Sequence, residues 1–194
     1  MVNVRGLDSR KIKDRRYFLN RFNPRQFFQV KQMNAIARSL YFDDFSVGQK
    51  FVTKARTITE ADIVNFAGLS WDHNQLHTDA EYAAATPFGR RIAHGLLGVI
   101  VHAGLSYELT EKSILALLEL TWQFKGPIYI GDTIHVEQRV KDLQPGSNGD
   151  RGVLTFEKKV INQKNEVVQT GTTTILLARR DNGIENRRQR AEDR

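Results

Sequence analysis

Residues 93–109 read AHGLLGVIVHAGLSYEL, a stretch that is apolar on nearly every side of a helix. A helix without a polar face is stable only when other parts of a protein surround it. Four strand-like segments follow, separated by short turn-forming runs, at residues 114–124, 133–142, 152–162 and 167–178. Consecutive strands with short turns predict an antiparallel meander. The expected architecture is α+β, with one long helix wrapped by a sheet.

The residues before this helix predict a further strand and a shorter helix. Residues 50–57 alternate between apolar and polar side chains, as a strand with one buried face does. Thr59 has the properties of a helix N-cap, with acidic residues in the turn that follows it. Ile63 and Phe66 give this second helix an apolar face.

The net charge of +7 is distributed unevenly along the chain. Residues 1–40 hold ten Lys or Arg and two Asp, whereas residues 41–178 hold thirteen basic and sixteen acidic residues. This pattern predicts a basic N-terminal extension (1–40), one domain (41–178) and a charged C-terminal tail (179–194). The extension contains several aromatic residues, so we expect part of it to dock on the domain or on a partner subunit, with a short helix near 26–39.

Several classes of protein are excluded by composition. No run approaches the roughly 18 apolar residues of a membrane span, and the first twenty residues lack the apolar segment of a secretory signal. The absence of cysteine excludes disulfides and thiolate metal sites. Neither a phosphate-binding glycine loop nor zinc-ligand spacing occurs. We therefore expect a cytoplasmic protein with no membrane partner, no metal and no cofactor.

The stretch that carries chemistry is SWDHNQLHTD, residues 70–79. On a continuous helix, Asp72 and His77 would be about 500° apart and would face different directions. If they act together, the helix must break between them, and Asn74 is suited to that because asparagine tolerates left-handed conformations and closes its own turns. A carboxylate and an imidazole that converge can hold a water molecule and move its protons. The alternative is a solvated Asp–His pair at a helix C-terminus.

Gly95 opens the apolar helix and has two possible roles. Without a Cβ, it lets a substrate approach its backbone N–H, where the helix dipole favours developing negative charge. Such a donor lowers a reaction barrier by about 3 kcal/mol. Alternatively, the glycine is needed only because the helix crosses the sheet closely there, and Gly98 fits either role. His94 taken alone is a packed or capping histidine.

These residues resemble a known family. The segment DHNQLH (72–77), followed after five residues by Ala83, is similar to the hydratase-2 motif of the MaoC-like dehydratases, the (R)-specific enoyl-CoA hydratases. The run FGRRIAHGLL (88–97) resembles that family's second block, and FKGPIYIGD (124–132) resembles its strand and turn before the meander. The resemblance covers about residues 41–178 and implies a hot-dog fold, in which a curved antiparallel sheet wraps a long helix.

The resemblance also implies an activity, the reversible hydration of a trans-2-enoyl thioester to the (R)-3-hydroxyacyl thioester. Asp72 and His77 would be the catalytic pair, with His77 activating water and Asp72 handling the α-carbon proton. The N–H of Gly95 would bind the thioester oxygen. Asn74, His94 and Leu96 would contact or shape the substrate site. The implied partners are an acyl-CoA or acyl carrier protein thioester and a second copy of the chain.

Three positions depart from the family pattern. Gln75 replaces the usual proline, Trp71 replaces the usual glycine, and Ala103 stands where many members have serine. None of the three removes a reacting group, so they bear on the choice of substrate and on the orientation of the catalytic side chains.

Two other functions remain open from the sequence. A thioesterase is possible because the hot-dog scaffold also hosts thioester hydrolysis. A non-catalytic protein that binds acyl thioesters, or nucleic acid through its basic extension, is the alternative from another class. Nucleic acid is the less expected partner, because the domain itself is mildly acidic.

Overall fold

The computed structural model describes residues 39–180. The chain divides into two units, 1–37 and 38–194, and every described residue belongs to the second. The expected docking of the N-terminal extension and nearly all of the expected helix at 26–39 lie outside the described residues. Most of the C-terminal tail lies outside them as well.

In the described part of the chain, two short strands and the helices come before the four long strands. In order, its elements are η1 (Phe42–Asp44), β1 (Lys50–Val52), β2 (Arg56–Thr57), α3 (Glu60–Ser70), α4 (Gln75–Thr78), α5 (Ala80–Ala84), α6 (Gly95–Ser106), η2 (Tyr107–Leu109), β3 (Ile114–Phe124), β4 (Thr133–Pro145), β5 (Arg151–Ile161) and β6 (Val167–Ala178).

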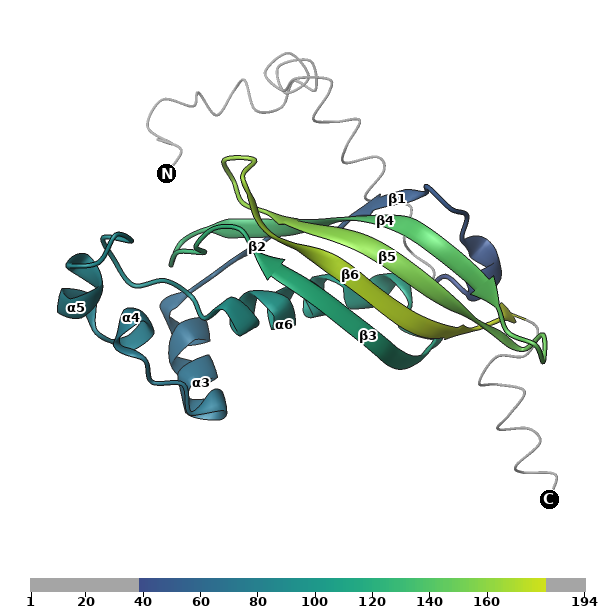
Figure 1. The fold of residues 1–194 in the computed structure, drawn as a ribbon, viewed down its shortest axis with the longest axis horizontal. Coiled ribbons are helices and arrows are strands. Elements are labelled where there is room, and N and C mark those ends of the chain that lie inside the picture. Colours follow the sequence, from purple (N-terminus) through teal and green to yellow (C-terminus); the bar gives the residue numbers. More distant parts are fainter. Residues whose placement is uncertain (1–38, 181–194) are drawn as a thin grey trace, which may run out of the picture. The chain divides into compact units, whose positions relative to one another are not determined.

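A curved antiparallel sheet packs against α6, as Figure 1 shows. Along β4 and β5 every second side chain is buried, which places one face of these strands against the helix. The core beneath the first half of α6 joins Leu97 and Val101 to Ile134 and Val160. This arrangement confirms the predicted α+β class.

The order of the strands differs from the predicted meander. The sheet runs β1-β4-β5-β6-β3, so β3 pairs with the last strand and not with β4. The cause lies in the link between β3 and β4. Its first amides, from Lys125 and Gly126, donate to the carbonyl of Val168, and the carbonyl of Ile128 then accepts from the N–H of Ala93. Because of these bonds, the link crosses the end of the sheet before β4 begins, and β4 does not pair with β3.

The predicted strand over 50–57 is divided into β1 and β2, both of which pair with β4. Thr53 lies between them and explains the interruption. Its N–H donates to the carbonyl of Val136, but the N–H of Val136 donates to the Thr53 hydroxyl and not to a backbone carbonyl. A side chain therefore replaces the backbone acceptor, and the regular ladder stops there.

Helix α6 (Gly95–Ser106) is shorter than the helix predicted over 93–109. Other parts of the chain cover only part of its surface. Leu97, Val101 and His102 are buried, whereas Leu96 and Ile100 on another side are more than half exposed. The sheet therefore wraps the helix as predicted, and it leaves one side of α6 open in the single chain. Among residues 39–180, no helix has both the length and the apolar character needed to cross a membrane.

Candidate active site

The end of α3 directs the chain into the candidate site. The helix begins as predicted: the Thr59 hydroxyl accepts from the N–H of Asp62, and the Asp62 carboxylate accepts from the N–H of Thr59. It ends at Ser70, and Trp71 then adopts a left-handed conformation with φ 62°. The helix therefore breaks before Asp72, as expected. The left-handed residue is Trp71 and not Asn74, which has φ −53°.

Asn74 closes the turn and starts α4. Its side-chain oxygen accepts a hydrogen bond from the N–H of Leu76 at 2.9 Å, so the predicted local turn is present. Gln75 is the first residue of α4, a position where proline is favoured because its missing N–H has no intrahelical acceptor. Glutamine satisfies the same geometry, which explains why the departure at Gln75 leaves the bend intact.

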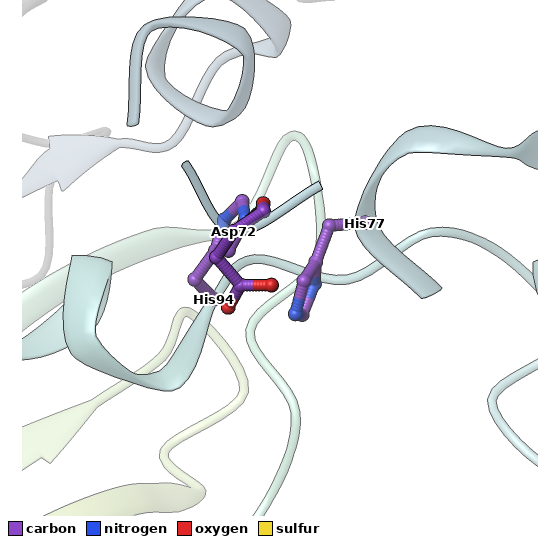
Figure 2. Close-up of side chains that lie close together, drawn as sticks. All are labelled: Asp72, His77 and His94. Carbon is purple, nitrogen blue, oxygen red and sulfur yellow. Dashed lines mark hydrogen bonds between the residues drawn. The ribbon is translucent and has the colours of Figure 1, made fainter. Parts of the chain in front are cut away.

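The bend brings Asp72 and His77 together and adds His94 to them. One potential ligand atom from each of these three residues lies within 4.8 Å of the other two. Figure 2 shows the carboxylate of Asp72 and the ring of His77 pointing toward the same space. His94 comes from the residue directly before α6, so the group joins the bend to the helix N-terminus.

Two backbone carbonyls determine which ring nitrogen carries hydrogen in each histidine. Nδ1 of His77 lies 2.9 Å from the carbonyl oxygen of Ile92, and Nε2 of His94 lies 2.9 Å from that of Asp72. A carbonyl only accepts, so each of these nitrogens donates. In the neutral rings, Nε2 of His77 and Nδ1 of His94 are consequently the acceptors.

His94 is held by rings on both sides. Its ring centroid lies 3.8 Å from that of His77 and 4.8 Å from that of Phe66. Burial lowers the pKa of His94 below its ordinary value, so the ring is neutral near pH 7. Its Nδ1 is buried without a hydrogen-bond partner among the described residues. A neutral His94 adds no positive charge beside His77.

The three side chains suit a water molecule better than a metal ion. Zinc requires nitrogen and oxygen ligands that converge from tetrahedral directions at about 2.0–2.2 Å. The ring centroids of His77 and His94 lie only 3.8 Å apart, which is too close for the two imidazoles to approach one ion from tetrahedral directions. The free Nε2 of His77 and the nearby carboxylate of Asp72 can instead share one water molecule.

Gly95 lies at the start of α6, where an N–H has no acceptor within the helix. Both roles considered for this glycine stay open. A Cβ on Gly95 would lie 2.9 Å from the ring of Phe124, so a larger residue would require this half-exposed side chain to move. The open N–H beside His94 also remains available to an anionic oxygen.

The sequence analysis missed Gln169, which fixes the first turn of α6. Its side-chain N–H donates to the carbonyl of Gly95 at 3.0 Å, and its oxygen accepts from the indole N–H of Trp122 at 3.0 Å. Gly98 makes this possible, because a Cβ there would lie 2.3 Å from the Gln169 amide nitrogen. The available signal was a polar side chain at a buried position of β6 opposite a glycine of the helix.

The remaining predicted residues lie near the surface. Leu96 is 62% exposed on α6, where it is open to a substrate or a partner. On the same surface, Arg91 forms a two-pronged pair with Glu60 at 2.8 and 2.6 Å. Arg90 stacks on the ring of Tyr129 at 4.1 Å.

The fold and the site define a class: a hot-dog protein with an acid and an imidazole beside the N-terminus of its central helix. The family model described as MaoC like domain matches residues 44–170. The chain therefore belongs to the MaoC-like domain family. The (R)-specific enoyl-CoA hydratase of Rhodospirillum rubrum is 35% identical over 141 residues, which are 72% of this chain and 93% of the relative. The 3-hydroxybutyryl-CoA dehydratase of Methylorubrum extorquens is 38% identical over 109 residues, 56% of this chain and 68% of the relative.

Solved structures agree with this assignment. The crystal structure of the MaoC-like dehydratase from Rhodospirillum rubrum matches with a TM-score of 0.66 and 28% identity, covering 73% of this chain and 99% of that one. A Mycobacterium tuberculosis protein described as having a double hotdog fold matches with a TM-score of 0.63 and 22% identity, covering 72% of this chain and 44% of that one. At that identity, the second likeness shows the fold alone. At family level, the relatives support enoyl-CoA hydration by a hydro-lyase.

Proposed function

We propose that this protein catalyses the reversible hydration of a trans-2-enoyl thioester to the (R)-3-hydroxyacyl thioester. The observation that carries the proposal is the convergence of Asp72 and His77 from one bend, to which His94, the residue before Gly95, is hydrogen-bonded. The relatives named as (R)-specific hydratase and as dehydratase support the same reaction.

The proposed reaction begins with the thioester oxygen on the N–H of Gly95. His77 receives a proton from water at Nε2, because its Nδ1 hydrogen is engaged by the carbonyl of Ile92. The hydroxide adds to the β-carbon, and the negative charge that develops on the thioester oxygen is stabilised by the N–H and the helix dipole. The proton that His77 took from the water passes to the carboxylate of Asp72, which delivers it to the α-carbon, so that both groups end the reaction in the state in which they began.

His94 has a supporting part in this proposal. Its Nε2–H holds the carbonyl of Asp72, and its ring packs on His77, so it fixes both members of the pair relative to the helix. Asn74 holds the bend through its bond to Leu76. Contacts of Asn74, His94 and Leu96 with the acyl group itself stay predictions, as does a cytoplasmic location.

The first prediction tests the pair directly. Asp72→Asn and His77→Ala should each lower kcat on a short trans-2-enoyl-CoA by about 10²-fold or more, because each removes a proton-transfer group. Loss of the alkene absorbance measures the rate. His73→Ala is the matched control, since it removes an exposed imidazole beside the pair and should retain most of the activity. Rates close to wild type in both site variants would refute the proposal.

The same assay separates hydration from thioester hydrolysis. A hydratase consumes the alkene without releasing free CoA, whereas a thioesterase releases a thiol that a colorimetric reagent detects. Chiral analysis of the product then establishes whether the hydroxy acid is the (R) enantiomer. Release of thiol at the rate of alkene loss would favour the thioesterase.

We also propose that two copies of the chain associate through β3. This strand ends the sheet, so one of its edges has no partner strand among the described residues. Leu118, Leu120 and Phe124 on this strand are each at least 42% exposed, and Phe124 reaches the start of α6 at Gly95. An apolar edge strand of this kind is normally covered in a stable protein.

A further inference from the structure

A row of polar side chains crosses the interior of the sheet without taking part in the proposed reaction. Gln138 of β4 is the register partner of Lys158 of β5, and Lys158 is in turn the partner of Gly171 of β6. Gly171 is paired with Trp122 of β3, whose ring stacks on His102 of α6 with centroids 4.2 Å apart. The row therefore lies beneath the middle of α6.

Thr173 lies on β6 two residues from Gly171, as the register partner of Phe156. We define the polar row as Gln138, Lys158, Thr173 and His102, and all four are almost fully buried. The exposed fractions of the four residues lie between 2% and 7%. Within residues 39–180, three of their atoms have no hydrogen-bond partner: Gln138 Oε1, Thr173 Oγ1 and His102 Nδ1. The Lys158 ammonium forms no hydrogen bond or ion pair in that range; it lies 5.5 Å from the centre of the Phe156 ring and acts electrostatically on His102.

Four incompletely satisfied polar groups in one place are unusual for a protein interior. Buried polar side chains nearly always find a partner, and a buried charge without an opposite charge is strongly unfavourable. A single anionic group explains the arrangement. A carboxylate beside these residues would accept hydrogen bonds from the Lys158 ammonium and the Thr173 hydroxyl, and it would leave ammonium hydrogens for the acceptor oxygen of Gln138.

The position of the polar row relative to the bend suggests where such a carboxylate comes from. His102 follows Gly95 by seven residues, which is about 10 Å along α6. An extended chain of about eight bonds spans that distance. A thioester bound at Gly95 would therefore bring the far end of a medium-length acyl chain to the level of Lys158.

We propose that the polar row is a subsite for a terminal carboxylate, and that the substrates are medium-chain enoyl thioesters that carry a carboxylate at the end remote from the thioester. The inference rests on the proposed hydration reaction and names its substrate class. Charge is consistent with this ligand. Burial and the nearby Lys158 lower the pKa of His102 to about 3, so His102 is neutral and Lys158 is the cation of the row.

The test compares two trans-2-enoyl-CoA substrates of about ten carbons, one ending in a methyl group and one in a carboxylate. Wild type should prefer the carboxylate in kcat/KM by at least about tenfold, the contribution expected of hydrogen bonds to a charged group. Lys158→Met should abolish the preference, and Thr173→Val should reduce it. Lys159→Met is the matched control, because its side chain is exposed on the neighbouring position and the preference should persist.

Two further measurements separate this inference from the proposed reaction. Trans-2-butenoyl-CoA is too short to reach Lys158, so Lys158→Met should hydrate it at the wild-type rate. Hydration of butenoyl-CoA without a carboxylate preference, or a preference that survives in Lys158→Met, would overturn the subsite and leave the reaction standing. If no enoyl thioester is hydrated, tighter calorimetric binding of a carboxylate-ended saturated acyl-CoA, dependent on Lys158, would support the subsite and refute the reaction.

Discussion

Trp71 is the residue at which the chain departs most clearly from unstrained geometry. It has φ 62°, a region that glycine adopts freely and other residues occupy at a cost. Its side chain is 84% exposed, so the indole does not fill the space between Asp72 and His77. The strain is therefore located at the point where the helix must end to form the site, which is where strained residues are commonly found.

Replacing Trp71 with glycine should therefore stabilise the protein. We expect Trp71→Gly to raise the free energy of unfolding by ~0.5–1 kcal/mol, because relief of the left-handed backbone exceeds the added entropy of the unfolded chain. Urea unfolding measures the change. Trp71→Ala removes the indole but keeps a Cβ, so it should give no such gain. Equal stabilisation by alanine would place the effect in the side chain and not in the backbone.

The convergence of the proposed catalytic pair could be predicted from the sequence, but the contacts that support it could not. Asp72 and His77 lie five residues apart, so one local break suffices to bring them together, and that break was expected. The residue that makes it was wrongly assigned to Asn74, because Trp71 adopts its conformation against its own preference. Gln169 is remote in sequence and contacts Gly95 only once the sheet is assembled.

At the scale of the elements, the position of α6 depends on the glycine at 98. The amide of Gln169 occupies the space that a side chain would take, and it holds both the Gly95 carbonyl and the Trp122 indole. Gln169 of β6 consequently holds the first turn of α6, which contains the proposed oxyanion donor, the N–H of Gly95.

Gly98→Ala should destabilise the protein by ~1–3 kcal/mol and lower kcat, because the new methyl group displaces Gln169 and leaves buried polar groups unpaired. Thermal unfolding and the hydration assay measure the two effects. Gly104→Ala is a control on the same helix: nothing lies within 4 Å of its Cβ, and alanine should stabilise the helix by up to ~1 kcal/mol. Similar effects of the two substitutions would contradict this account of Gly98.

Local patterns predicted the elements better than their arrangement. The Thr59 cap, the apolar helix and the strand segments all follow from short-range spacing, and the structure contains them. The pairing of β3 with β6 depends on hydrogen bonds between the link 125–132 and segments far away in sequence, such as Ala93 and Val168. The polar row was overlooked although Lys158 falls in phase with the buried Phe156 and Val160.

For the molecule as a whole, the buried Lys158 predicts an unusual alkaline response. Burial lowers the pKa of Lys158 from 10.5 to about 8. Between these values the unfolded chain keeps a proton that the folded protein has released, so the free energy of unfolding rises with pH. The contribution of this group should increase by about 3 kcal/mol from pH 8 to pH 10.5.

The difference in urea stability between wild type and Lys158→Met isolates this contribution from other groups. At pH 7.5 the variant should be more stable than wild type, because a methionine buries without a charge, and the advantage should shrink as pH rises toward 10.5. Lys159→Met should show neither effect. A pH-independent difference would mean that Lys158 keeps its proton, or is solvated, in the folded protein.

Association through β3 gives a prediction at the same scale. Leu118→Glu should convert a dimer to a monomer in sedimentation velocity experiments, because it introduces a charge into the proposed apolar interface. Val47→Glu makes the same change at a comparably exposed site, in the turn before β1 at the opposite edge of the sheet, and should leave the dimer intact. A wild-type chain that sediments as a monomer at micromolar concentration would refute the interface.

The segment from Trp71 to His77 is attached to the rest of the molecule by few bonds, two of which run between an imidazole and a backbone carbonyl. Such an attachment can release while the strands stay paired, since none of those bonds belongs to the ladder. Loss of catalysis and loss of the fold are then separate events with separate temperatures. On heating, the segment that carries Asp72 and His77 should open, with loss of activity, at a temperature well below that at which the sheet unfolds.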